Sequence, residues 1–166
     1  MNAIRRRAIE QAQSLTRDVA AELGLEIVEF DFHDQGRHSR LRVDVDRAGV
    51  PGVTLADCER LSRALDTRLD AIEGLQASYE LQVSSPGLDR PIRSDDDIRR
   101  NTGRDVRLQY RDEAGRVVEG RGVLAGPGPD GSVRLVTPDG ERAVFRDRIL
   151  LMKQDVNPSG SRQRRP

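Results

Sequence analysis

The stretch LQVSSPGLDRPI, residues 81–92, decides how the chain is organised, because a strand-like run ends there in two serines, a Pro-Gly pair and a second proline. A proline fixes its own backbone and keeps the preceding residue extended. The pattern predicts a turn with Pro86 and Gly87 at its corners, and Pro91 stiffens the exit. We therefore interpret this stretch as a rigid elbow between two domains.

Two catalytic interpretations of the loop find little support. A serine hydrolase needs a nucleophile elbow, and neither Ser84 nor Ser85 lies in a GxSxG motif. The two histidines, His33 and His38, fall on or beside the first predicted hairpin, where we expect ordinary exposed side chains. A nucleotide-binding loop needs successive backbone N–H groups and a Gly-Lys-Ser or Gly-Lys-Thr motif, which the sequence lacks. We expect no enzyme activity, no metal and no cofactor.

Upstream of the loop, hydrophobic spacing predicts an α-β-β-α-β domain over residues 1–91. Apolar residues recur at helical spacing over residues 3–23 and 55–72, and Thr54 with Asp57 forms a capping-box pattern before the second helix. Alternating apolar and polar residues predict three strands: LEIVEFDFH (25–33), RLRVDVD (40–46) and YELQVS (79–84). We expect both helices to cover one face of this sheet and the other face to stay open.

The open face is expected to be mainly acidic. Its predicted residues are Glu29, Asp31, His33, Arg42, Asp44, Asp46, Glu80 and Gln82. The chain has five aromatic residues and no tryptophan, so this sheet is not expected to stack RNA bases. The acidic members Glu29, Asp31, Asp44, Asp46 and Glu80 are instead candidates for binding a basic protein, although an ordinary solvated face explains them equally well.

Downstream of the loop the pattern changes twice. SDDDIRRNTG, residues 94–103, predicts a short helix capped by Ser94 and Asp97, within a linker over residues 92–103. Short strands separated by turn signals then predict a small SH3-like or Sm-like β-barrel over residues 104–153. The whole chain is therefore expected to be an α+β protein.

Two further features complete the second half. Gly120 and Gly122 would permit the sharp strand bend that a small barrel requires. The segment 154–166 has no periodicity and several arginines, so it is predicted to be a disordered basic tail.

The two halves of the chain carry opposite charges. Residues 1–98 have 13 arginines against 19 acidic residues, a net charge of −6, whereas residues 99–166 have a net charge of +6. This asymmetry favours two surfaces with different partners, unless the halves simply attract each other. The barrel arginines are therefore candidates for RNA phosphates: Arg104, Arg107, Arg121 and Arg134.

Composition also indicates a compartment. No run of about 18 apolar residues occurs, and the N-terminus lacks the apolar core of a secretory signal, so no membrane segment is expected. Cys58 is the only cysteine and lies on the apolar stripe of the second helix, where we expect a small buried side chain. A chain without a possible internal disulfide suits the cytoplasm.

Two long segments together resemble the ribosome maturation factor RimP family: VTLADCERLSRALDTRLD (53–70) and YELQVSSPGLDRPIRSDDDIRRNTGRDVRLQY (79–110). The order of helix, strand, SSPGLDRP, short capped helix and barrel strand is that of the family. Eight residues match its signature loop: Ser84, Ser85, Pro86, Gly87, Leu88, Asp89, Arg90 and Pro91. We call these eight residues the signature loop.

The resemblance implies a non-enzymatic assembly factor with an N-terminal α/β domain and a C-terminal barrel. It would bind the free small ribosomal subunit, through ribosomal RNA and a basic ribosomal protein, as a cytoplasmic monomer. Two alternatives remain open: a nuclease that uses Glu29, Asp44 and Asp46 with a divalent ion, and a general RNA chaperone with no ribosomal target.

Overall fold

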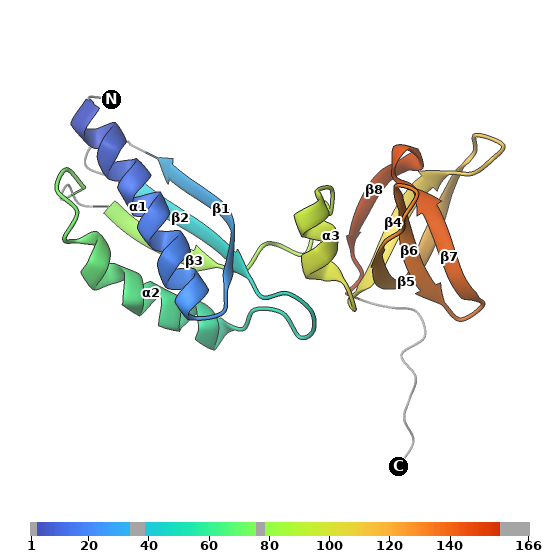
Figure 1. Ribbon diagram of the computed structural model, residues 1–166, viewed down its shortest axis with the longest axis horizontal. Helices are drawn as coiled ribbons and strands as arrows, with labels where there is room; N and C mark the ends of the chain where they lie inside the picture. Colours follow the sequence, from blue (N-terminus) through green and yellow to red (C-terminus); the bar gives the residue numbers. More distant parts are fainter. Residues whose placement is uncertain (1–2, 34–38, 76–78, 157–166) are drawn as a thin grey trace, which may run out of the picture. The chain divides into compact units, whose positions relative to one another are not determined.

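The computed structural model describes residues 3–33, 39–75 and 79–156 (Figure 1). The chain divides into two compact units. The boundary between them along the chain falls between Pro86 and Gly87, inside the signature loop. Each unit has its own apolar core. No helix in the described part of the chain is long and apolar enough to cross a membrane.

The first unit has the predicted element order. Its helices and strands are α1 (Ala3–Glu22), β1 (Glu26–His33), β2 (Ser39–Asp46), α2 (Leu55–Leu69) and β3 (Tyr79–Ser84). The sheet order is β1-β2-β3, with β1 antiparallel and β3 parallel to β2. A parallel neighbour requires a crossover connection, and α2 supplies it.

The core of the first unit lies between the helices and one face of the sheet. On β2, Leu41, Val43 and Val45 alternate with polar residues and are fully buried. Both helices cover this same face (Figure 1). They supply most of the other core residues: Ala8, Ala12, Val19, Ala20, Cys58, Leu61, Leu65 and Leu69. The predicted amphipathic helices and the helix-covered sheet are therefore present.

One arginine joins the ends of the two helices. Arg47 donates to the carbonyl oxygens of Leu23 and Gly24, just beyond α1, and to Asp57 Oδ1 at 2.9 Å. Asp57 also closes the predicted capping box of α2 with Thr54. Cations suit the negative end of a helix and carboxylates suit the positive end, so this contact matches both helix dipoles.

The second unit is an antiparallel sheet with one short helix. Its elements are α3 (Asp95–Asn101), β4 (Asp105–Arg111), β5 (Val117–Pro127), β6 (Ser132–Thr137), β7 (Gly140–Phe145), the 3-10 helix η2 (Arg146–Arg148) and β8 (Ile149–Gln154). The strand order is β7-β6-β5-β4-β8. Within the described residues no pairing joins the edge strands β7 and β8, so the pairing itself does not close the predicted barrel.

The sheet is nevertheless strongly curved, because the pairing partner of β5 changes along its length. Residues 117–123 of β5 pair with β4, and residues 123–127 pair with β6. The curvature brings β7 back to β4, where Arg142 Nη1 lies 3.4 Å from the hydroxyl oxygen of Tyr110. Those two strands are separated by two others in the sheet order.

The short helix belongs to the second unit. Ile98 of α3 is 1% exposed and packs in the same core as Val106 and Leu124. The N–H of Ile92 donates to the Met152 carbonyl oxygen at 2.8 Å, which joins the segment before α3 to β8. Residues 92–103 were expected to link two domains, but their apolar side chains need burial and find it against the sheet. Of the predicted tail, residues 157–166 lie outside the described residues.

Replacing Gly122 should test the bend. A Cβ built at Gly122 would lie 2.7 Å from the carbonyl oxygen of Val136, too close for β5 and β6 to keep their positions. We expect Gly122→Ala to lower the free energy of unfolding of the second unit by about 1–3 kcal/mol. Gly87→Ala is the control, since a Cβ there meets nothing within 4 Å.

Denaturant unfolding followed by tyrosine fluorescence measures this effect. The chain has two tyrosines, Tyr79 in the first unit and Tyr110 in the second, so a Tyr79→Phe background reports the second unit alone. Equal stability of the two glycine variants would show that the close approach at Gly122 carries no strain.

Candidate functional site

The first half of the signature loop is tied to the first unit. Ser84, at the end of β3, donates its hydroxyl hydrogen to Asp44 Oδ1 of β2 at 2.9 Å. Ser85 is exposed and Pro86 is half-buried. Ser84 therefore acts as a hydrogen-bond donor to a carboxylate, and its neighbours connect the two units.

The turn of the loop lies later than predicted. The N–H of Arg90 donates to the Gly87 carbonyl oxygen at 2.9 Å, so Leu88 and Asp89 occupy the corners. Gly87 has no positive φ, and neither corner residue needs one. The prediction of corners at Pro86 and Gly87 is wrong, because a turn with negative φ angles accepts ordinary residues and needs no glycine.

The second half of the loop is fixed to β8. Asp89 Oδ1 lies 3.5 Å from Lys153 Nζ. The N–H of Ile92, the residue after Pro91, donates to the Met152 carbonyl oxygen. Leu88 is 54% exposed. The two ends of the signature loop thus have partners in different units.

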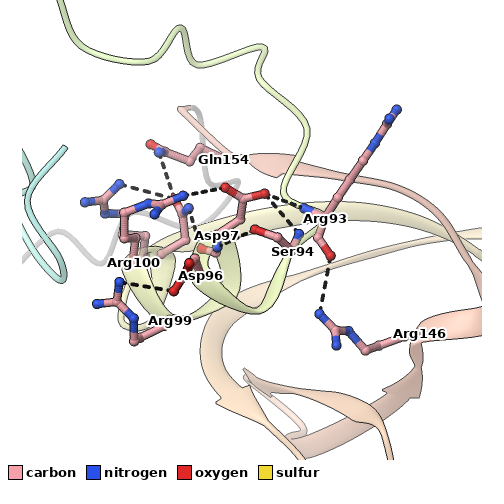
Figure 2. Close-up of polar contacts among 10 residues, drawn as sticks. Arg93, Ser94, Asp96, Asp97, Arg99, Arg100, Arg146 and Gln154 are labelled. Carbon is pink, nitrogen blue, oxygen red and sulfur yellow. Dashed lines mark hydrogen bonds and ion pairs between the residues drawn. The ribbon is translucent and has the colours of Figure 1, made fainter. Parts of the chain in front are cut away.

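The acidic cluster after the loop is a helix cap (Figure 2). Ser94 Oγ accepts from the N–H of Asp97, while Asp97 Oδ2 accepts from the N–H groups of Ser94 and Arg93. Arg100, largely buried, pairs with the other oxygen of Asp97 at 2.7 Å. Burial by itself would raise the pKa of Asp97, but these hydrogen bonds and the Arg100 charge together lower it.

A second contact fixes this segment to the sheet. Arg146 of η2 pairs with Asp95. It also donates to the Arg93 carbonyl oxygen at 3.3 Å (Figure 2). Asp97 therefore caps the helix as predicted, and Asp95 contacts η2, which was not predicted.

The open face of the first sheet carries mixed charge. Residues opposite one another on β1, β2 and β3 form three rows: His33-Arg40-Glu80, Asp31-Arg42-Gln82 and Glu29-Asp44-Ser84. Glu29, Asp31 and Glu80 are exposed, as expected. The exposed Arg40 also lies on this face. The predicted set of open-face residues omitted it, because the alternation of apolar and polar residues was counted from Leu41 onward.

The two central acids of this face are not exposed. Asp44 is 2% exposed and Asp46 is 4% exposed, which contradicts the prediction of an open acidic surface at these positions. Arg42 contacts both oxygens of Asp44, at 3.0 and 2.8 Å. Asp46 accepts from the N–H groups of Arg47 and Val53, so the connection after β2 folds back onto it. Both carboxylates hold local structure.

This arrangement bears on the nuclease alternative. Divalent ions need carboxylate oxygens that are available for coordination. Both oxygens of Asp44 already accept hydrogen bonds from Arg42, and one of them also accepts from Ser84. Over residues 3–33, 39–75 and 79–156, no group of three or more metal-ligating side chains is present. The hydrogen bonds on both oxygens of Asp44 therefore count against the role of metal ligand that the nuclease alternative gives this residue.

A row of cations crosses the second sheet. Arg107 of β4 stands opposite Arg121 of β5 on one side and opposite Lys153 of β8 on the other. Arg121 lies 3.5 Å from Asp155, and Lys153 lies 3.5 Å from Asp89. The side chain of Arg107, exposed in the middle, has no hydrogen bond or ion pair with any described residue. We call Lys153, Arg107 and Arg121 the basic row.

The other two candidate arginines lie elsewhere. Arg104 is half-buried and donates to Asn101 Oδ1 at 3.2 Å, so it braces the end of α3. Arg134 of β6 pairs with Glu141 of β7 at 3.4 Å. Two of the four candidate arginines, Arg107 and Arg121, therefore belong to the basic row. Lys153 is the third member, and only the strand register places it beside Arg107.

The remaining candidate side chains have ordinary environments. His33 is exposed, with Nδ1 3.6 Å from Asp31 Oδ2, and His38 lies outside the described residues. Cys58 is buried in the first core, and burial raises the pKa of its thiol. The prediction of a small buried cysteine is confirmed.

Comparison with known families identifies the first unit. Residues 15–89 match the family described as the RimP N-terminal domain. The match runs from α1 to the turn of the signature loop and confirms the resemblance to the RimP family.

The Arg42 contact predicts a stability effect. Arg42→Gln removes the cation that neutralises a buried carboxylate, so we expect the first unit to unfold at a lower denaturant concentration. Arg40→Gln, an exposed arginine on the same strand and face, should change this midpoint much less. Tyr79 fluorescence in a Tyr110→Phe background measures both, and equal midpoints would contradict a supporting role for Arg42.

The lowered pKa of Asp97 predicts a pH effect. Its folded-state pKa lies below the unfolded value of about 4, so its charge contributes stability above that pH, and this contribution is lost as pH falls through the folded value. We expect Asp97→Asn to be less stable than wild type at neutral pH and to lose less on acidification. Asp96→Asn, at the exposed neighbouring position, should keep the wild-type profile in unfolding measured from pH 7 to pH 2.

Proposed function

We propose that this chain, which carries the N-terminal domain of the RimP family of ribosome maturation factors, binds the free small ribosomal subunit and assists its assembly without catalysing a reaction. The basic row is the observation that carries the RNA part of the proposal. Like charges placed directly opposite one another on neighbouring strands destabilise a sheet. Phosphate groups of ribosomal RNA would remove that cost on binding.

The row is suited to a backbone contact. Its central Arg107 has no carboxylate to exchange for a phosphate, and the acid beside Lys153, Asp89, is 91% exposed and held only at 3.5 Å. Breaking such an exposed pair costs little. Contacts of this kind position a protein on RNA without reading its sequence, and they weaken as salt rises.

The first unit supplies a second, different surface. Its exposed acids Glu29, Asp31 and Glu80 lie on one sheet face, interleaved with Arg40 and Arg42. We propose that this face contacts a basic ribosomal protein, with the acids as the attractive groups. The buried Asp44 and Asp46 take no part in the contact.

A preference for one arrangement of the subunit suffices as mechanism. A ligand shifts a conformational equilibrium by the ratio of its affinities for the two states. A factor that binds ribosomal RNA and a ribosomal protein at the same time favours the arrangement of the subunit in which both are correctly placed. Because one copy presents both surfaces, we propose that the protein acts as a monomer, and its single buried thiol suits the reducing cytoplasm.

Charge changes in the row test this function. We expect Arg107→Glu to weaken binding to isolated small subunits, and Arg107→Gln to reduce the slope of log affinity against log salt by about 1. Arg17→Glu, an exposed arginine of α1 in the other unit, is the charge-matched control. Affinities come from co-sedimentation over a salt series.

The outcomes are distinct. If Arg107→Glu and Arg17→Glu bind small subunits equally well, the row is the wrong surface. If unrelated RNAs compete as strongly as small subunits do, the chain is a general RNA chaperone and the proposed target is wrong.

A further inference from the structure

The second unit has a small pocket lined by aromatic side chains and arginines. It has a volume of about 250 Å³ and lies where the end of β4, the strand β7 and η2 meet. The residues that matter in its lining are Tyr110, Arg111, Arg142, Phe145 and Arg148. It combines two aromatic rings with three arginines, and none of these five residues except Tyr110 packs against the core.

The aromatic content of this pocket is unusual for this chain. Of its five aromatic residues, Phe30, Phe32 and Tyr79 pack against the core of the first unit. The other two, Tyr110 and Phe145, both line the pocket. Phe145 is 44% exposed, so a large apolar ring remains in contact with water. Burial of the Phe145 ring against a ligand would remove this apolar surface from water, which is favourable.

The arginines around the rings are available to an anion. Arg148 places its guanidinium 5.6 Å from the centre of the Phe145 ring, and Arg142 contacts the hydroxyl of Tyr110. Arg111 donates to the Gly115 carbonyl oxygen. In the described part of the chain, none of these three arginines has a carboxylate partner.

The nearby acids do not cancel this charge. Asp112 accepts from the backbone N–H groups of Arg116 and Ala114 and pairs with the Arg116 side chain at 2.8 Å. The Arg116 N–H is the main cause of the lowered pKa of Asp112. The Asp112 charge is thus used within its own hairpin. Of the acids that line the pocket, this leaves the exposed Glu113.

We propose that this pocket binds one unstacked nucleotide of single-stranded RNA, with its base on the Phe145 ring and its phosphate held by Arg142 and Arg148. Aromatic side chains accept the face of any base, and planar guanidinium groups match phosphate oxygens. A volume of about 250 Å³ is below the range of about 300–1,000 Å³ that is typical of pockets for drug-sized ligands, so a single flat base suits it better than a larger molecule.

The strand geometry connects the pocket to the basic row. Arg107 and Arg111 lie four residues apart on the same face of β4, about 13 Å along the strand. An RNA strand that follows β4 would place phosphates on the row and the next unpaired base in the pocket. This inference rests on the proposed function only in taking ribosomal RNA as the natural source of the strand.

The test uses the full chain in a Tyr79→Phe background, which leaves Tyr110 as the only tyrosine. A labelled oligouridine and an abasic strand of equal length and charge are titrated by fluorescence anisotropy. We expect Phe145→Leu to weaken binding of the oligouridine about five- to a hundredfold and to leave binding of the abasic strand unchanged. Arg148→Gln should weaken binding of both, and bound bases should quench Tyr110 fluorescence in the parent protein.

Val136→Ala is the matched control, because Val136 is a similarly exposed apolar residue of the same sheet outside the pocket lining. It should bind both strands like the parent. Denaturant unfolding checks that Phe145→Leu keeps its fold. The proposal is overturned if Phe145→Leu binds oligouridine normally or weakens binding of both strands equally. It is also overturned if uridine monophosphate binds as tightly as the strand, which would indicate a site for free nucleotides.

Failure of this inference and failure of the proposed function look different. If the chain binds oligouridine through Phe145 but does not bind small subunits, the nucleotide pocket stands and the proposed function is wrong. A chain in which Phe145→Leu reduces binding to small subunits but not to RNA uses the pocket for a protein, and the nucleotide assignment is then wrong while the proposed function stands.

Discussion

The close approach of β5 to β6 at Gly122 is the constraint on which the surfaces of the second unit depend. A side chain there would meet the Val136 carbonyl oxygen, so only glycine lets β5 leave β4 and continue along β6. The resulting curvature brings Arg142 of β7 to Tyr110 of β4. Without that return there would be no pocket between the two strands, although all the residues that line it would still be present.

The same sheet holds three cations against one another. The register of β4 with its two neighbours places Arg107 between Arg121 and Lys153, and the sheet tolerates this because Arg121 and Lys153 each have an acid nearby. The first unit handles its own unfavourable charges differently. Asp44 is buried, but both of its carboxylate oxygens accept hydrogen bonds, from Arg42 and Ser84. One unit therefore neutralises its central charges internally, and the other leaves Arg107 exposed to solvent.

Local patterns in the sequence were sufficient for the helices, the strands of the first unit and both capping boxes, because spacing and short-range hydrogen bonds decide them. They failed where distant segments meet. Asp44 and Asp46 follow a perfect alternation, yet they are buried because Arg42 and the connection after β2 cover them. The pocket joins Tyr110 to Phe145, and the basic row joins Lys153 to Arg107. The basic row is detectable only from the register of β4 with its neighbours, and the pocket only from the curvature of the sheet.

Lys153 links the signature loop to the proposed RNA surface. It stands opposite Arg107 in the row and also lies near Asp89, at a corner of the loop turn. A phosphate on the row therefore competes with Asp89 for the same ammonium group. Since Asp89 is almost fully exposed, water can replace its partner at little cost, whereas the N–H of Ile92 keeps the end of the loop joined to β8. Binding of an anion would then release the Asp89 side chain from Lys153. The hydrogen bond from the Arg90 N–H that closes the turn, and the anchor on the second unit, would stay in place.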